Sequence, residues 1–343
     1  MKKGLTIAFI ICVTKIFAQD YHFTQTNQFV LLQNPANTGL FDGWERAGIG
    51  HKTQWANAGS KFQTSVISAD LSLFRKRTGD RPSLGLGLLF LNDKAGDSRF
   101  GTKQMLLSVS GIIPLAESHK ISMGLQAGLG QKSGDFSQLV FASQFNGNEL
   151  DSKINSGESD NLSSFIYPDI SIGGLYQFGS NQSSFNSGDQ PKIVAGLAYY
   201  HLNRPTLRFR LSGGSEPLYA KWVIHGSYGK VIKGSDQGFE FIFNQTIQGP
   251  HTETNIGALF RHYMSKGSRV TGLKQPSYIS FGMFYRHKDA LAPMVQLNYK
   301  GFDFGVSYDI TLSKIGQVSR GGGIEFSLVY TNLDYALFKR QRY

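Results

Sequence analysis

The chain has 343 residues, with 40 glycines, 13% aromatic residues, only 17% charged residues and a formal net charge of +11. So few charges are unusual for a soluble enzyme, whereas glycine and aromatic residues are abundant in membrane β-barrels, in crowded lumen positions and at the membrane interfaces. The basic residues are scattered along the chain, which argues against nucleic acid as a partner and favours anionic lipid or an acidic protein.

Residues 1–19 are predicted to form a signal peptide. Two lysines open the segment, an apolar stretch over 5–13 follows, and cleavage is expected before Gln19 or Asp20. The apolar stretch is too short to span a membrane. The single cysteine, Cys12, lies within this segment. The exported chain is therefore expected to have no disulfide, no thiol nucleophile and no cysteine-based metal site.

Residues 20–44 are predicted to form a periplasmic N-terminal segment without long regular structure. They contain the run Asn34-Pro35-Ala36-Asn37-Thr38-Gly39, in which proline and glycine disfavour a continuous helix or strand. Two placements are open for this segment: a lead-in to the following domain, or a piece tucked into it.

The stretch 302–312, FDFGVSYDITL, alternates strictly between apolar side chains at even positions and small or polar ones at odd positions. A β-strand sends successive side chains to opposite faces, so one face is apolar and the other wettable. The length is close to that of a tilted strand that crosses a bilayer. The apolar face would meet lipid in a transmembrane barrel, or a core in a soluble sandwich.

The same pattern recurs from residue 45 onward and predicts an all-β protein. The expected strands are 45–57, 61–73, 83–93, 101–113, 119–131, 167–178, 191–202, 219–231, 237–248, 253–264, 277–287, 291–299, 302–312 and 322–333. A soluble β-sandwich of this size would need a very large core, whereas in a barrel lipid covers the apolar face. We therefore predict a transmembrane antiparallel up-and-down β-barrel over 45–343, with about 14 strands.

An even number of strands puts both ends of the barrel on one side of the membrane, which for such barrels is the periplasm. The longest connection, 132–166, is then extracellular. It carries Phe136, Phe141, Phe145 and Phe165 among glycine, serine, asparagine and aspartate. An aromatic-bearing polar loop suits contact with a protein or a lid over the pore; the alternative is a solvated loop whose phenylalanines pack on the barrel rim.

The sequence predicts no catalytic, cofactor or metal site. No histidine shares a metal-ligand spacing with another histidine or a carboxylate cluster, and no G-x-S-x-G, P-loop or HExxH motif occurs. Asp303 and Asp309 lie on one face of a strand, roughly 20 Å apart, too far for a paired-carboxylate mechanism. We expect them to face basic partners in the lumen, such as Arg261 or Arg286.

An ordered set of short motifs resembles one family, the PorP/SprF outer-membrane proteins of the type IX secretion system of Bacteroidota. The matching segments are 19–25 (QDYHFTQ), 34–36 (NPA) with Gly39, 54–55 (QW), 92–96 (NDKAG), 168–169 (PD), 201–205 (HLNRP), 285–286 (YR), 289–290 (DA), 305–309 (GVSYD) and 324–328 (IEFSL). The family usually has a histidine just before the glutamate of the last strand, and Gly321-Gly322-Gly323 before Ile324-Glu325 lacks it, which leaves any role of that histidine in doubt.

The resemblance implies a non-enzymatic outer-membrane barrel that uses no cofactor. Such a protein works with other type IX secretion components, including periplasmic lipoproteins, and binds a secreted surface protein of adhesin type, as in gliding motility, for export or attachment. Asn34, Pro35 and Trp55 join the four loop phenylalanines as candidate partner contacts. Two other functions stay open: a passive porin-like channel, and a barrel enzyme of lipase or palmitoyl-transfer type, for which the sequence offers no catalytic cluster.

Overall fold

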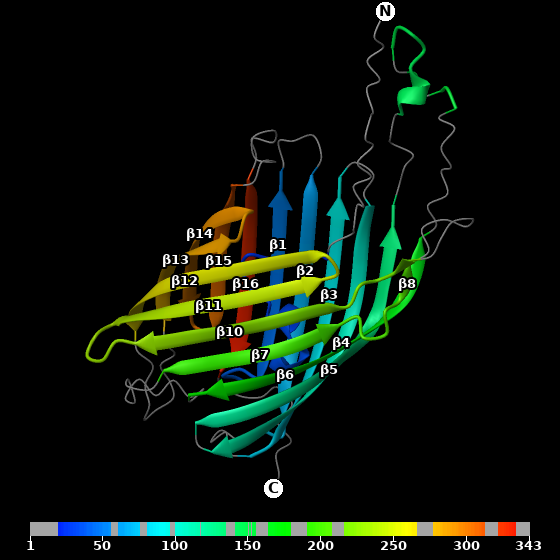
Figure 1. The fold of residues 1–343 in the computed structure, drawn as a ribbon. Helices are drawn as coiled ribbons and strands as arrows, with labels where there is room; N and C mark the ends of the chain where they lie inside the picture. The colour runs from blue at the N-terminus through cyan, green and yellow to red at the C-terminus, as the bar shows by residue number, and fades with distance from the viewer. Residues whose placement is uncertain are drawn as a thin grey trace, which may run out of the picture.

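A computed structural model describes residues 20–55, 61–75, 81–96, 100–116, 118–134, 141–149, 151, 153–155, 164–179, 191–207, 216–265, 277–312 and 322–333. Fourteen of the described strands form a closed barrel, in which each strand pairs with its neighbours in sequence and β1 pairs with β16 (Figure 1). All of these pairings are antiparallel. The predicted fold class is confirmed.

The barrel strands follow the predicted ranges closely. They are β1 (Glu45–Gln54), β2 (Phe62–Leu73), β3 (Ser83–Ala95), β4 (Phe100–Ala116), β5 (His119–Ser133), β6 (Phe165–Phe178), β7 (Lys192–Tyr200), β10 (Lys221–Val231), β11 (Gln237–Gln248), β12 (His251–Ser265), β13 (Ser277–Arg286), β14 (Ala290–Tyr299), β15 (Phe302–Thr311) and β16 (Gly323–Asn332). Most differences lie at strand ends, where hydrogen bonding extends a strand beyond its alternating pattern, as at β4.

The two faces of each strand differ as the alternation predicts. In β4, Met105 and Leu107 are 54% and 60% exposed, whereas Ser108 and Ser110 are each 1% exposed. In β15, the aromatic residues Phe302, Phe304 and Tyr308 all lie on the outer surface. Large apolar side chains thus cover the outside of the barrel, where lipid would contact them, and small or polar side chains point into the lumen.

The pairing of β1 with β16 defines the two ends of the barrel. Glu45 lies opposite Asn332 at the end where β1 begins and β16 finishes, here named the entry end. Gln54 lies opposite Gly323 at the other end, here named the far end. In Figure 1 the blue strand β1 stands beside the red strand β16, and the barrel closes between them.

Five short elements lie outside the barrel wall, and the sequence did not predict them. They are α1 (Val30–Gln33), the 3-10 helices η1 (Pro35–Asn37) and η2 (Ala142–Gln144), and the strand pair β8 (Thr206–Leu207) and β9 (Glu216–Pro217). Each has four residues or fewer, too few to carry a periodic pattern. No helix in the described part of the chain is long and apolar enough to cross a membrane.

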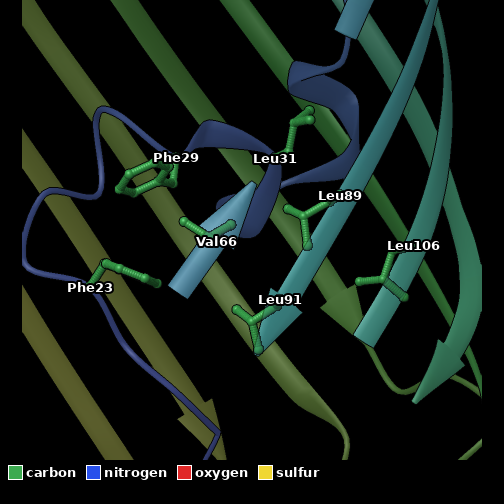
Figure 2. Packing of buried hydrophobic residues seen from close by; sticks show 7 residues of the cluster. All are labelled: Phe23, Phe29, Leu31, Val66, Leu89, Leu91 and Leu106. Carbon is green, nitrogen blue, oxygen red and sulfur yellow. The ribbon is translucent and has the colours of Figure 1, made fainter. Parts of the chain in front are cut away.

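Residues 20–44 lie inside the barrel and are here named the plug. Phe23, Phe29 and Leu31 of the plug are almost completely buried against inward-facing side chains of β2, β3 and β4 (Figure 2). Those wall residues are Val66, Leu89, Leu91 and Leu106. The segment is therefore tucked into the barrel, one of the two placements that the sequence left open, and it is not a free lead-in.

Candidate functional site

The plug runs through the lumen from the far end to the entry end. Its first described residue, Asp20, contacts Lys221 at the start of β10, which is at the far end. Its last residue, Trp44, donates its backbone N–H to the carbonyl of Asn332 at the entry end and accepts from Ser72 of β2. Polar contacts with the wall anchor it at several levels between these ends.

The first anchor is a buried charge cluster at the far end. The ring of His201 lies between two carboxylates, with Nε2 2.9 Å from Oδ2 of Asp20 and Nδ1 2.9 Å from Oδ1 of Asp169. The ammonium group of Lys221 donates to the same oxygen of Asp20 at 2.8 Å. His201 and Asp169 are each 2% exposed. The backbone of His201 has φ 57°, an uncommon value outside glycine.

Burial and charge act in opposite directions on this cluster. Burial alone would lower the pKa of His201, but Asp20 and Asp169 raise it to about 9, so the ring is an imidazolium at neutral pH. Burial alone would raise the pKa of Asp20, but Lys221 and His201 hold it well below its usual range. The plug therefore begins with an ionised carboxylate between two cations of the wall.

The second anchor joins Thr24 and Gln25 to the strands that close the barrel. The carboxylate of Glu325 in β16 accepts the backbone N–H of Thr24 at 2.9 Å and that of Gln25 at 2.8 Å. The hydroxyl of Thr24 donates to Asp309 at 2.8 Å and accepts from Arg286 at 2.9 Å. All five residues are buried. Charged groups of the wall thus satisfy the plug's backbone, which makes these hydrogen bonds stronger than neutral ones.

Asn34 anchors the centre of the plug through its side-chain amide. Its Oδ1 accepts the N–H of Ala36 at 2.9 Å, the usual N-cap bond of a short helix. Its Nδ2 donates to the carbonyl of Gly174 at 2.9 Å and lies 3.1 Å from Nε2 of His225. Asn34 is completely buried, so its amide closes the turn and also fixes the turn to β6 and β10.

Glycines of the wall let the plug backbone approach closely. A Cβ on Gly124 of β5 would lie 2.4 Å from the carbonyl carbon and oxygen of Pro35, and a Cβ on Gly85 of β3 would lie 2.2 Å from the carbonyl oxygen of Thr38. These neighbours are backbone atoms, which cannot swing aside as a side chain can. Only glycine allows this contact between plug and wall.

The last anchor lies at the entry end. Asp70 of β2 accepts the backbone N–H of Gly39 at 2.8 Å and is held by Arg46 of β1 through two bonds of 2.9 and 2.7 Å. Arg75 donates to the plug carbonyls of Phe41 and, at 2.9 Å, Gly43. The plug is thereby fixed just before the chain enters β1.

Both lumen aspartates face a predicted basic partner, Asp309 through a direct contact and Asp303 at longer range. Asp309 accepts a hydrogen bond from Arg286 at 2.9 Å. Asp303 accepts from Gln296 at 2.7 Å and lies within electrostatic reach of Arg261, whose direct ion pair is with Glu240 on the adjacent strand β11. The sequence does not reveal this choice, because it depends on the register of β11 against β12.

The predicted partner-binding residues fall in three environments. Phe136 lies outside the described residues. Phe145 is 53% exposed, and Phe141 and Trp55 are half-buried, with Trp55 at the far end of β1. Phe165 packs at the far end against Tyr167, Leu207 and Leu218, as the rim-packing alternative proposed. Asn34 and Pro35 are buried in the lumen, where they contact the barrel wall. Binding of a partner protein by any of these residues stays a prediction.

Sequence reasoning missed four charged wall residues of the anchors: Arg46, Lys52, Asp70 and Lys221. The sequence does carry a pattern that could have identified these four residues. Each stands on the lumen-facing side of a strand whose other inward residues are mostly small or uncharged, and a charge buried there requires a partner. Lys52, for example, is 3% exposed and lies 3.3 Å from Asp309.

The segments on which the family resemblance rests meet at the anchors. They supply Asp20, Thr24, Gln25, Asn34, Asp169, His201, Arg286, Asp309, Glu325 and Ser327. Their contacts hold a folded segment in place, and nothing in their arrangement resembles a nucleophile with its base. In the described part of the chain, no group of three or more His, Cys, Asp or Glu side chains could hold a metal ion.

Comparison with known proteins gives one family and a set of remote barrels. Three solved barrels with low identity are the toluene transporter TbuX of Ralstonia pickettii (10% identity, 88% of this chain and 91% of that chain, TM-score 0.47), BamA of Haemophilus ducreyi (10%, 84% and 70%, 0.44) and the β domain of the Bordetella autotransporter BrkA (10%, 84% and 99%, 0.43). These TM-scores are too low to carry information on function. No curated protein sequence matches the chain.

The family comparison covers nearly the whole chain. The family described as "Type IX secretion system membrane protein PorP/SprF" matches residues 16–330, which include the plug and almost the entire barrel. The chain therefore belongs to the PorP/SprF family of type IX secretion system membrane proteins, and it is an outer-membrane β-barrel.

Proposed function

We propose that this protein is a plugged, non-enzymatic docking barrel of the type IX secretion machinery. It binds a secreted surface protein of adhesin type outside the cell and contacts periplasmic components of the machine, including lipoproteins, inside. Residues 1–19 direct its export and are removed. Both barrel termini then lie on the periplasmic side, so the entry end faces the periplasm and the far end faces outward.

The observation that carries this proposal is the filled lumen. The plug passes from one end of the barrel to the other, and hydrogen bonds to buried charged groups of the wall fix it near both ends. A channel for solutes needs a continuous water-filled path, whereas a docking platform needs a rigid body that keeps the outer membrane sealed. The anchors therefore favour docking over the porin-like alternative.

The outward-facing end offers the surface for a secreted partner. The connection between β5 and β6 carries Phe145 with its ring largely exposed and Phe141 half-buried. Exposed aromatic side chains are frequent anchors of protein interfaces, because they bury a large apolar area with little loss of side-chain entropy. The short pair β8–β9 and Trp55 lie at the same end and extend this surface.

Deletion of the outer loop tests the proposal. Replacing residues 136–162 with a short Gly-Ser linker is expected to abolish retention of the secreted partner at the cell surface, measured by surface labelling of intact cells. The barrel should keep its heat-modifiable mobility on gels, which reports a folded barrel.

Point variants sharpen this experiment. Phe145→Ser should reduce retention, whereas Phe74→Ser is the matched control, since Phe74 is 76% exposed but lies at the entry end. Full retention in the loop deletion would reject the assignment of this loop. A steady conductance of the purified protein in planar bilayers would instead favour the porin-like channel.

A further inference from the structure

A pocket lies at the entry end, between the last part of the plug and the wall strands β3, β4 and β5. Plug residues 39–41 form one side, and Pro114 and Lys120 of the wall lie on another. Arg75 and Arg81, which flank the connection between β2 and β3, also line it, as do Ser83 and Ile112. The position of the pocket makes it accessible from the periplasm in the orientation proposed above.

Among the described residues, positive charge in and beside this pocket exceeds negative charge. Arg81 and Lys120 have no hydrogen-bond or ion-pair partner among the described residues, and Lys192 of the neighbouring wall also lacks one. The nearby carboxylate is Asp42, whose Oδ1 lies 3.7 Å from Nη2 of Arg75. Burial raises the pKa of Asp42, and Lys192, Arg75 and Lys120 act against that rise, so all three cations lie within electrostatic reach of this carboxylate.

The other anchors of the plug are electrically balanced. Arg46 lies 2.7 Å from Asp70, Arg286 lies 2.9 Å from Asp309, and Lys221 lies 2.8 Å from Asp20. Unbalanced cations that converge on one concave site repel one another, and an anion that enters the site relieves this repulsion. Among the residues that the structure describes, this excess of positive charge favours an anionic ligand.

We infer that this pocket binds carboxylate side chains of an acidic segment that belongs to a periplasmic partner protein. This inference rests on the proposed function and adds the chemistry of the inner contact. A planar guanidinium matches a carboxylate with two parallel hydrogen bonds, and Arg81 and Lys120 supply free donors. Lipid headgroups are less suited, because Lys120 lies on the lumen side of β5, in line with Ser122 and Gly124, while lipid covers the outside.

The occupant would also touch the plug. Arg75 already donates to the carbonyls of Phe41 and Gly43, so a carboxylate bound beside it meets the plug where the chain turns into β1. A partner bound here therefore contacts the plug and the barrel wall together.

The test uses the purified full-length protein in detergent and two fluorescent peptides, hexaglutamate and hexaglutamine. Wild-type protein is expected to bind hexaglutamate with an affinity that falls steeply as salt is added, and to leave hexaglutamine unbound. The double variant Arg81→Gln/Lys120→Gln should bind hexaglutamate at least tenfold more weakly. Lys300→Gln, at the same end of the barrel but outside the pocket, should bind like wild type.

Two further measurements make the outcome decisive. Lys120→Glu should weaken hexaglutamate binding more than Lys120→Gln does, because the new carboxylate repels the peptide, and heat-modifiability on gels confirms that each variant is folded. Equal affinity of wild type and the double variant for hexaglutamate would overturn the inference. The inference would also be overturned if inorganic phosphate displaced hexaglutamate at a concentration similar to that of the peptide. This result would assign the pocket to a free anion. Peptide binding does not depend on the secreted partner, so failure here is distinct from failure of the loop deletion.

Discussion

The imidazole of His201 sits between the carboxylates of Asp20 and Asp169, where the plug begins, and this position makes the anchor sensitive to alkaline pH. Its pKa is raised from an ordinary 6.5 to about 9 in the folded protein. The stabilisation is therefore fully present below pH 6.5 and is lost as the pH rises through about 9. A difference of this size corresponds to roughly 3 kcal/mol.

Thermal unfolding of the purified protein in detergent at pH 6, 8 and 10 measures this effect. We expect the midpoint to fall between pH 8 and pH 10, because His201 then loses the proton that both carboxylates stabilise. His201→Gln is the control: it should be less stable at pH 6 and should show a flatter profile, since the titrating group is gone. Parallel pH profiles for the two proteins would contradict this role of His201.

The plug and the wall fit together as two elements through backbone contact, which the neighbouring strands β4 and β5 allow us to test. A Cβ on Gly124 meets the backbone of Pro35 at 2.4 Å, whereas a Cβ on Gly111 of β4 meets nothing within 4 Å. Gly124→Ala should therefore lower the free energy of unfolding by about 1–3 kcal/mol, the usual cost of overpacking. Gly111→Ala, the matched control, should change it by less than about 0.5 kcal/mol.

Urea unfolding of both variants, followed by the heat-modifiable band, gives the comparison. A reporter of the plug itself comes from Ala36→Cys, because Ala36 is completely buried and the only native cysteine, Cys12, lies in residues 1–19. In this background Gly124→Ala should accelerate labelling by a maleimide, while Gly111→Ala should leave the labelling rate unchanged. Equal effects of the two alanines would show that the plug does not press on β5.

The wall was predictable from the sequence because its signal is local and repeated. Each strand carries the alternation in its own residues, as β15 does with Phe302, Phe304 and Tyr308 outside and Asp303 and Asp309 inside. Lipid on one side and lumen on the other impose the same rule on every strand. The strand count and most boundaries follow from that rule.

The conformation of the plug was not predictable in the same way, because its signal is not local. The turn at Asn34 depends on acceptors in β6 and β7, far along the chain, and Thr24 depends on groups in β13, β15 and β16. Proline and glycine correctly argued against a long helix or strand in this segment. The conformation that the plug adopts depends on the shape and the hydrogen-bonding groups of the lumen, and this lumen exists only after the barrel closes.

At the scale of the whole molecule, the plug determines whether the barrel is a sealed body or a pore. Buried charged groups of the wall hold it near both ends of the lumen, and an apolar cluster with Phe29 and Leu31 holds it against β2, β3 and β4. The intact protein should therefore show no steady conductance in a planar lipid bilayer. Deletion of residues 20–40 removes most of these contacts and should produce a steady, ohmic conductance, because the wall keeps its closed hydrogen bonding.

A deletion of equal length in the outer loop, residues 140–160, is the control for this measurement. It removes as much chain but leaves the plug anchored, so it should remain closed, and both proteins must keep heat-modifiable mobility before they are compared. Steady conductance in the intact protein would mean that water passes around the plug and would support the channel function. If the variant that lacks residues 20–40 folds but shows no conductance, wall side chains alone seal the lumen. The wall residues responsible would then be a buried cluster on the β11–β14 side of the lumen, formed by Ile242, Leu259, Phe284 and Met294.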